Sequence, residues 1–177
     1  MSAVAYTALV LAVAAERLVE LRVTRRHVAW AQARGGVESG RGHYPVMVAL
    51  HVGLLAGAVA EVWLADRPFL PWLGWPMLAL LLVAQALRWW CIRTLGPQWS
   101  TRVVVVPGSA LVAAGPYRWL RHPNYVAVVV EGVALPLVHT AWVTALTFTV
   151  ADAVVLTVRV RCENAALAAA TPAAARR

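Results

Sequence analysis

Long runs of apolar residues are the feature that most limits how this chain can fold. They cover residues 3–21, 44–65, 76–95, 125–138 and 141–158. A helix needs about 20 apolar residues to cross a hydrocarbon layer of about 30 Å, and inside that layer every backbone polar group must be paired within the protein. The runs therefore predict an all-α integral membrane protein with about five transmembrane helices.

The composition agrees with a membrane protein. Of the 177 residues, 61% are hydrophobic and only 14% are charged, whereas soluble domains carry about 45–50% apolar and about 25% charged residues. Cys91 and Cys162 lie in no ligand-like spacing, so we expect neither a disulfide framework nor a metal site. The first apolar run lacks a basic segment before it and a small-residue cleavage site, which indicates a retained span.

The last two apolar runs are separated by two residues only. Because the run 125–138 is short for a full span and contains Pro136 near its end, the pair predicts a C-terminal helical hairpin. Glu131 lies in its first arm and Asp152 in its second. Ionisable groups at that depth are costly unless they face a partner or a cavity.

The arginines predict the orientation of the spans. All 16 basic residues are arginine and the formal net charge is +8. If the spans alternate, the arginines of segments 22–43, 96–124 and 159–177 share one side and only Arg67 lies opposite. By the positive-inside rule the N-terminus is outside and the C-terminus cytoplasmic. We therefore expect an inner-membrane protein in contact with membrane lipids, and no nucleic-acid partner.

The longest stretch that is not a membrane run reads GPQWSTRVVVVPGSALVAAGPYRWLRHPNY, residues 96–125. A loop of this length is usually functional or disordered, and this one is too rich in Val, Trp and Tyr for disorder. The chain contains no GxGxxG, Walker A, HExxH or GxSxG motif, so hydrolases and phosphate-loop enzymes have no support. We expect the functional site in this loop, facing the cytoplasm.

Three segments together carry a resemblance to a known family. GPYRWLRHPNY, then an apolar run with Glu131 and Gly132, then RVRCENAAL, resemble the C-terminal core of the isoprenylcysteine carboxyl methyltransferase family. These are integral membrane enzymes that use S-adenosylmethionine. GHYPVMVALH at 42–51 and LRWWCIRTLGPQWSTRVVVVPG at 87–108 extend the likeness to a small bacterial branch that methylates alkylpyrones beside type III polyketide synthases.

The resemblance implies an S-adenosylmethionine-dependent O-methyltransferase that releases S-adenosylhomocysteine. Its acceptor would be a lipophilic small molecule, such as the enolic hydroxyl of an alkylpyrone, and a type III polyketide synthase would be its functional partner. It also implies one membrane domain over residues 1–177. Within it, 1–95 holds three spans, 96–167 the cofactor loop, hairpin and catalytic segment, and 168–177 a tail.

The resemblance further implies roles for individual residues. The positions expected to bind the cofactor are Arg102, Ser109, Ala110, Leu111, Val112, Tyr117, His122, Pro123, Asn124, Tyr125 and Glu163. Arg159 and His122 are the expected catalytic residues, and Arg159, Glu131 and His51 the expected substrate-binding residues. Arg159 and Glu163 are spaced i and i+4, so on a helix they share one face.

Physical chemistry gives these assignments a rationale and leaves alternatives open. A hydroxypyrone is an acidic enol, so Arg159 could hold its enolate oxygen, with His122 as base if a proton must be removed. Asn164 stands where the family often has a second acid, which leaves any role for that acid without support. Methylation of a carboxylate or thiol, a membrane reductase and a non-catalytic scaffold are the alternatives. His122 and Tyr125 could equally cap the hairpin, and Glu131 could join helices.

Overall fold

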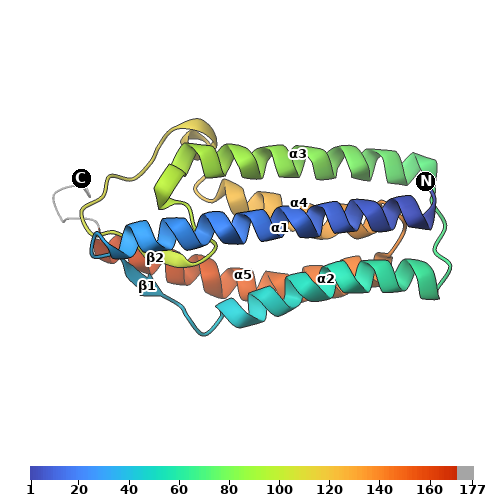
Figure 1. Ribbon diagram of the computed structural model, residues 1–177, viewed down its shortest axis with the longest axis horizontal. Helices are drawn as coiled ribbons and strands as arrows, with labels where there is room; N and C mark the ends of the chain where they lie inside the picture. The colour runs from blue at the N-terminus through green and yellow to red at the C-terminus, as the bar shows by residue number, and fades with distance from the viewer. Residues whose placement is uncertain (171–177) are drawn as a thin grey trace.

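Five helices form the computed structural model, which describes residues 1–170 (Figure 1). Residues 171–177, with Arg176 and Arg177 and most of the expected tail, lie outside the described part. The helices are α1 (Ala3–Gln32), α2 (Tyr44–Leu64), α3 (Pro71–Leu95), α4 (Pro123–Leu137) and α5 (Trp142–Ala170). The predicted all-α architecture with a C-terminal hairpin, α4–α5, is confirmed.

The helices alternate in direction, which gathers the longer connections at one end of the bundle. That end, called the loop end below, carries residues 33–43, residues 96–122 and the last turns of α5 (Figure 1). The opposite end carries the N-terminus and the short connections 65–70 and 138–141. Arg67 lies in that opposite set, as the alternating spans predict.

Helix lengths differ from the sequence prediction in three places. α1 continues past residue 21 to Gln32, because no helix breaker follows until Gly35, whose φ is +74°. α3 begins at Pro71 rather than at residue 76, since proline is well tolerated in the first helical turn. α5 runs through its alanines to Ala170. At about 1.5 Å per residue, the 30 residues of α1 exceed the thickness of a bilayer core.

Within residues 1–170, three helices are long and apolar enough to cross a membrane: α2, α3 and α5. α4, with 15 residues, is apolar but shorter. Many outward side chains on these helices are large and apolar, including Leu64 at 85% and Val154 at 65% exposure. Such surfaces are favourable only against lipid.

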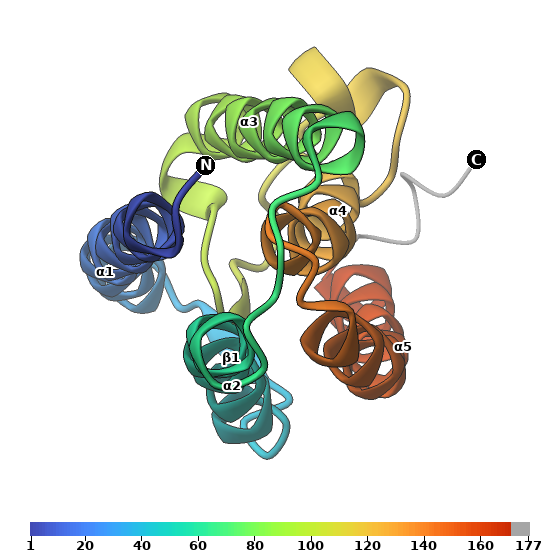
Figure 2. The same ribbon diagram turned by 90° about the vertical axis from the view of Figure 1, so that its right-hand side faces the viewer.

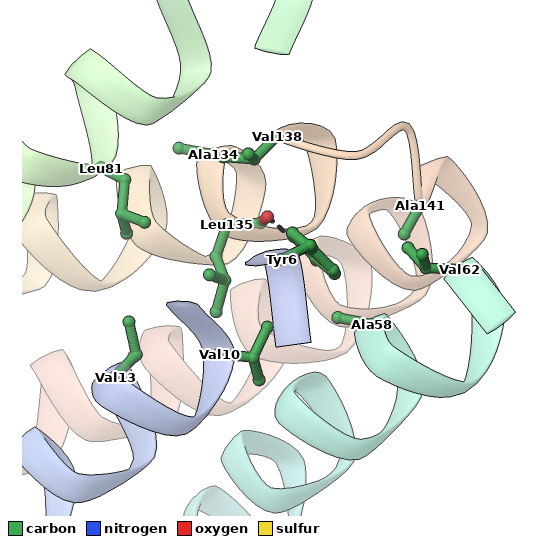
Figure 3. Close-up of a cluster of buried hydrophobic side chains, with 10 residues drawn as sticks. All are labelled: Tyr6, Val10, Val13, Ala58, Val62, Leu81, Ala134, Leu135, Val138 and Ala141. Carbon is green, nitrogen blue, oxygen red and sulfur yellow. Dashed lines mark hydrogen bonds between the residues drawn. The ribbon is translucent and has the colours of Figure 1, made fainter. Parts of the chain in front are cut away.

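An apolar core joins the helices near the N-terminal end of α1. Tyr6 is fully buried there with Val10, Leu81 and Leu135, and its hydroxyl donates to the Leu135 carbonyl oxygen at 3.1 Å (Figure 3). Figure 2 shows α4 between α3 and α5, against which it packs most extensively. This arrangement fixes α4, whose first residues belong to the site described below.

A buried group of charges joins α1, α3 and α4. Glu20, Arg88 and Glu131 are each no more than 4% exposed. The Arg88 Nη2 donates to Glu131 Oε2, and its Nε lies 3.6 Å from Glu20 Oε1. Arg17 reaches Glu20 at 2.8 Å and Glu131 at 3.5 Å. Because these charges are paired, α1 can carry Arg17 and Glu20 inside the bundle, although they interrupt its apolar run.

Removal of Arg88 should therefore destabilise the bundle severely. Arg88→Leu leaves Glu20 and Glu131 buried with fewer partners, a change that costs about 3–5 kcal/mol in buried pairs of this kind. Thermal unfolding in detergent measures the loss. Arg93→Leu, an exposed position on the same helix, is the matched control. Adding Glu131→Leu to Arg88→Leu should recover part of the stability, and equal stability of Arg88→Leu and wild type would contradict this account.

Candidate active site

A cavity of about 710 Å³ lies at the loop end, between α1, α5 and the segment that joins α3 to α4. Two short strands shape that segment, since β1 (Val37–Ser39) pairs antiparallel with β2 (Val103–Val105). Gly115 turns the chain with a φ of +53°, and a Cβ there would meet Thr94 Oγ1 at 2.6 Å. The cavity volume falls in the range of about 300–1,000 Å³ typical of small-molecule sites.

Three side chains from α4 and α5 form a hydrogen-bonded chain in the cavity wall. The Arg159 Nε donates to the Tyr125 hydroxyl at 2.9 Å, and that hydroxyl donates to Glu163 Oε2. Arg159 and Glu163 share a helical face, as their spacing predicts. Tyr125 therefore sets the position of both a cation and an anion.

Arg159 has no carboxylate of its own. It is 5% exposed, and its Nη1 contacts the Met47 sulfur at 3.4 Å. Among the described residues, no carboxylate lies within ion-pair distance of its guanidinium. A buried cation in this state is stabilised by any anion that enters the cavity.

His122 precedes α4 and lies against Glu163 and Asn164. Its Nε2 donates to Asn164 Oδ1 at 3.0 Å, and its Nδ1 lies 3.5 Å from Glu163 Oε1. The hydrogen bond to Glu163 raises the pKa of His122 above its ordinary value, against the opposing effect of burial. Both ring nitrogens thus face acceptors, which favours the imidazolium. Asn164, which replaces an acid, serves here as an acceptor.

The loop residues predicted to bind a cofactor also face the cavity. They are Arg102, Ser109, Ala110, Leu111, Val112 and Tyr117. Residues 109–112 form neither helix nor strand, so their backbone groups can bond a ligand. The Arg102 guanidinium lies 3.3 Å from Glu38 and 5.0 Å from the Tyr44 ring centre.

Three predicted residues lie outside the cavity wall. Pro123 is fully buried in the first turn of α4. Glu131 belongs to the charged group around Arg88, which fits the alternative that it joins helices. His51 packs edge-on against Phe148 at 5.4 Å between ring centres. The functional roles expected for these three residues stay predictions.

Trp99 is a cavity residue that the sequence did not single out. It is 3% exposed, and within residues 1–170 its indole Nε1 has no hydrogen-bond partner. The C-terminal part of α1 also lines the cavity, through residues such as Val28 and Ala31. The sequence feature that could have indicated Trp99 is a large aromatic residue shortly after the Gly96–Pro97 pair that ends α3. The contribution of α1 could not be foreseen while that helix was expected to end at residue 21.

Comparisons with known proteins agree with the resemblance seen in the sequence. The model of the isoprenylcysteine carboxyl methyltransferase (ICMT) family matches residues 77–169, which include the hairpin and most of the cavity wall. The chain belongs to this family.

Two relatives from other bacteria match most of the chain. The uncharacterized protein YpbQ of Bacillus subtilis is 39% identical over 153 residues, covering 86% of this chain and 90% of that protein. An uncharacterized protein of Haemophilus influenzae is 26% identical over 154 residues, covering 85% and 88%. Membership of the ICMT family implies S-adenosylmethionine-dependent methyl transfer by an integral membrane protein and leaves the acceptor open.

The cavity wall of this ICMT-family protein offers groups that fit S-adenosylmethionine. Asn124 Oδ1 and Trp99 Nε1 are a buried acceptor and a buried donor without partners among residues 1–170, and both residues line the cavity. The cofactor carries an ammonium, a carboxylate, hydroxyls and ring nitrogens, which can use both kinds of group. Glu163 suits the ammonium, and His122, whose ring nitrogens face Asn164 and Glu163, holds the Glu163 carboxylate in place.

Stability should fall with rising pH because of His122. Its pKa is raised in the folded protein, so its contribution is complete below about pH 6.5, the ordinary value, and is lost as the pH rises through the raised value. Thermal unfolding of the detergent-solubilised protein from pH 5 to 9 measures this. His122→Gln should remove that component, since its amide can still donate to Glu163 but does not titrate. Identical pH profiles for the two proteins would count against the pairing.

Loss of the Tyr125 hydroxyl should weaken cofactor binding. Tyr125→Phe removes the group that links Arg159 to Glu163, and a bond to a charged partner is worth about 1.5–3 kcal/mol, or roughly ten- to a hundredfold in affinity. Titration calorimetry with S-adenosylhomocysteine gives the affinity. Tyr44→Phe, whose hydroxyl makes only a 3.4 Å contact with Thr101, is the control and should bind as wild type does.

Proposed function

We propose that this protein transfers a methyl group from S-adenosylmethionine to the hydroxyl of a lipophilic acceptor, with the enolic hydroxyl of an alkylpyrone-type polyketide as the first candidate. The observation that carries the proposal is Arg159, a buried guanidinium in the cavity wall with no carboxylate partner among residues 1–170. A buried positive charge of this kind favours an anionic ligand. An enolate is such a ligand at neutral pH.

Each polar side chain then has a distinct task. Glu163, Asn124, Trp99 and the backbone of residues 109–112 hold the cofactor, which supplies a methyl group on a positively charged sulfur. Arg159, kept in place by Tyr125, orients the acceptor oxygen toward that methyl group. Positioning of this kind can supply several kcal/mol of barrier lowering, about 7–11 at best.

No strong base is required for an enolate acceptor, because its oxygen has already lost its proton. His122 is poorly placed to take one, since both of its ring nitrogens already face Asn164 and Glu163. We therefore assign His122 to positioning Glu163 beside the cofactor and keep Arg159 as the residue that contacts the reacting oxygen. The oxygen gains the methyl carbon as the bond from that carbon to sulfur breaks.

The position of the cavity suits a water-soluble cofactor and a lipid-dissolved acceptor. The cavity lies at the loop end, where the arginines outside the spans gather, and the positive-inside rule places that end in the cytoplasm. In this proposal the acceptor approaches from the lipid along exposed apolar side chains of α4 and α5, such as Val129 and Val154. A type III polyketide synthase is the class of enzyme that would supply an alkylpyrone, and we propose one as the functional partner.

An acceptor panel tests the proposal. Membranes containing the protein are incubated with methyl-labelled cofactor and a 4-hydroxy-6-alkyl-2-pyrone, a prenylcysteine or an alkyl thiol, and labelled lipid product is counted. We expect labelling of the pyrone, and Arg159→Gln should lower its kcat/KM roughly ten- to a hundredfold, the effect of losing a bond to a charged partner.

The controls separate the remaining possibilities. Arg118→Gln alters an exposed arginine at the loop end outside the cavity wall and should keep full activity. Transfer to prenylcysteine or thiol alone would retain the methyltransferase but replace its acceptor. Nicotinamide-dependent turnover without a response to S-adenosylhomocysteine would overturn the proposal in favour of a reductase.

A further inference from the structure

A second hollow lies farther from the loop end than the cavity, on the outer face of the α4–α5 pair. It is a groove of about 450 Å³ with apolar walls from Val129 on α4 and from Phe148, Leu156 and Val160 on α5. Val129 is 41% exposed, so the groove opens toward the lipid. Asp152 and Arg161 are the charged residues in its wall.

Asp152 is buried without a direct partner. It is 4% exposed, and within residues 1–170 no hydrogen bond or ion pair reaches its carboxyl group, although His51 and Arg159 act on it electrostatically at longer range. His51 cannot donate to it when neutral, because its Nδ1 proton is used by the Met47 carbonyl oxygen at 2.8 Å. An unsatisfied carboxyl group inside a membrane is costly, so a donor from a ligand would stabilise it.

The groove and the cavity lie along the same two helices. Tyr125 lines the cavity and Val129, one turn further along α4, lines the groove. On α5, Arg159 lines the cavity and Asp152 the groove, seven positions and therefore about 10 Å apart on one side of the helix. An elongated molecule in the groove can therefore place one end beside Arg159.

We propose that Asp152 recognises the methyl acceptor by accepting a hydrogen bond from a hydroxyl or amide N–H group on its chain, roughly 10 Å from the reacting oxygen. This inference rests on the proposed function, which places that oxygen at Arg159. The acceptor is then a lipid with an anionic head and a hydrogen-bond donor part-way along its apolar chain, so among alkylpyrones a hydroxylated chain is preferred over a plain alkyl chain. An ordinary phospholipid acyl chain would fill the groove but offer Asp152 no donor.

Paired photoreactive lipids test this recognition in the full-length protein in nanodiscs. The first probe is a diazirine-bearing fatty acid with a hydroxyl roughly 10 Å from its carboxylate, and the second is its methyl ether, which cannot donate. Mass spectrometry of the labelled peptides locates and counts the cross-links. The hydroxyl probe should label the groove residues of α4 and α5 about five- to tenfold more than the ether, the effect of one hydrogen bond.

Three variants determine whether Asp152 causes the preference. Asp152→Ala should remove it, and Asp152→Asn, whose amide oxygen still accepts, should keep part of it. Thr157→Val alters a groove side chain whose hydroxyl already donates to the Ala153 carbonyl oxygen and should leave the preference unchanged. Equal labelling by both probes in the wild type, or an unchanged preference in Asp152→Ala, overturns the inference and identifies a groove for ordinary lipid.

Measuring S-adenosylhomocysteine binding in the same nanodiscs distinguishes failure of this inference from failure of the proposed function. Wild-type protein that binds S-adenosylhomocysteine but labels equally with both probes retains the methyltransferase proposal and loses only the role of Asp152. Protein that prefers the hydroxyl probe but binds no S-adenosylhomocysteine retains the groove as a lipid-recognition site and loses the methyltransferase proposal.

Discussion

Charge inside the membrane is the constraint on which this structure depends. A charged side chain at that depth is stable only beside a partner, because neither lipid nor an apolar core replaces its hydration. Glu20, Arg88 and Glu131 meet this requirement from three different helices. Their pairing fixes α1 and α3 against α4, and α4 in turn carries Tyr125 into the cavity wall. The site thus rests on a charged group that lies outside the cavity wall.

Two buried arginines illustrate the difference between support and function. Arg88 has carboxylates on both sides, and its charge is balanced within the bundle. Arg159 is equally buried, but within residues 1–170 its direct contacts are a tyrosine hydroxyl and a methionine sulfur, while Glu163 and Asp152 interact with it at longer range. Since the same membrane surrounds both, the missing counter-charge at Arg159 is better explained by a ligand than by packing. This contrast between two buried arginines is stronger evidence for a ligand at Arg159 than the burial of Arg159 alone.

The sequence predicted the helices, their alternation and the loop that forms the cavity, because the length of an apolar run and the positions of arginines can be read within short segments. It placed Arg159 and Glu163 on one face through their spacing, and the link through Tyr125 is consistent with that. The pairing of Glu131 with Arg88 depends on contacts between distant segments, for which no local pattern exists. Trp99 was missed for a related reason. It lines the cavity because α1, α5 and the loop, which are distant in sequence, meet there.

The arrangement along α5 connects these observations. Glu163, Arg159 and Asp152 lie on one side of the helix and differ in what satisfies them. Glu163 accepts hydrogen bonds near the loop end, and within residues 1–170 no carboxylate pairs directly with Arg159 and no donor reaches Asp152. If a ligand meets each requirement, a cation and hydroxyls lie beside Glu163, an anion lies beside Arg159, and a hydrogen-bond donor on an apolar chain lies beside Asp152. That order matches the proposed pair of ligands, a soluble sulfonium cofactor and a lipid acceptor, which under this proposal would be aligned by one helix.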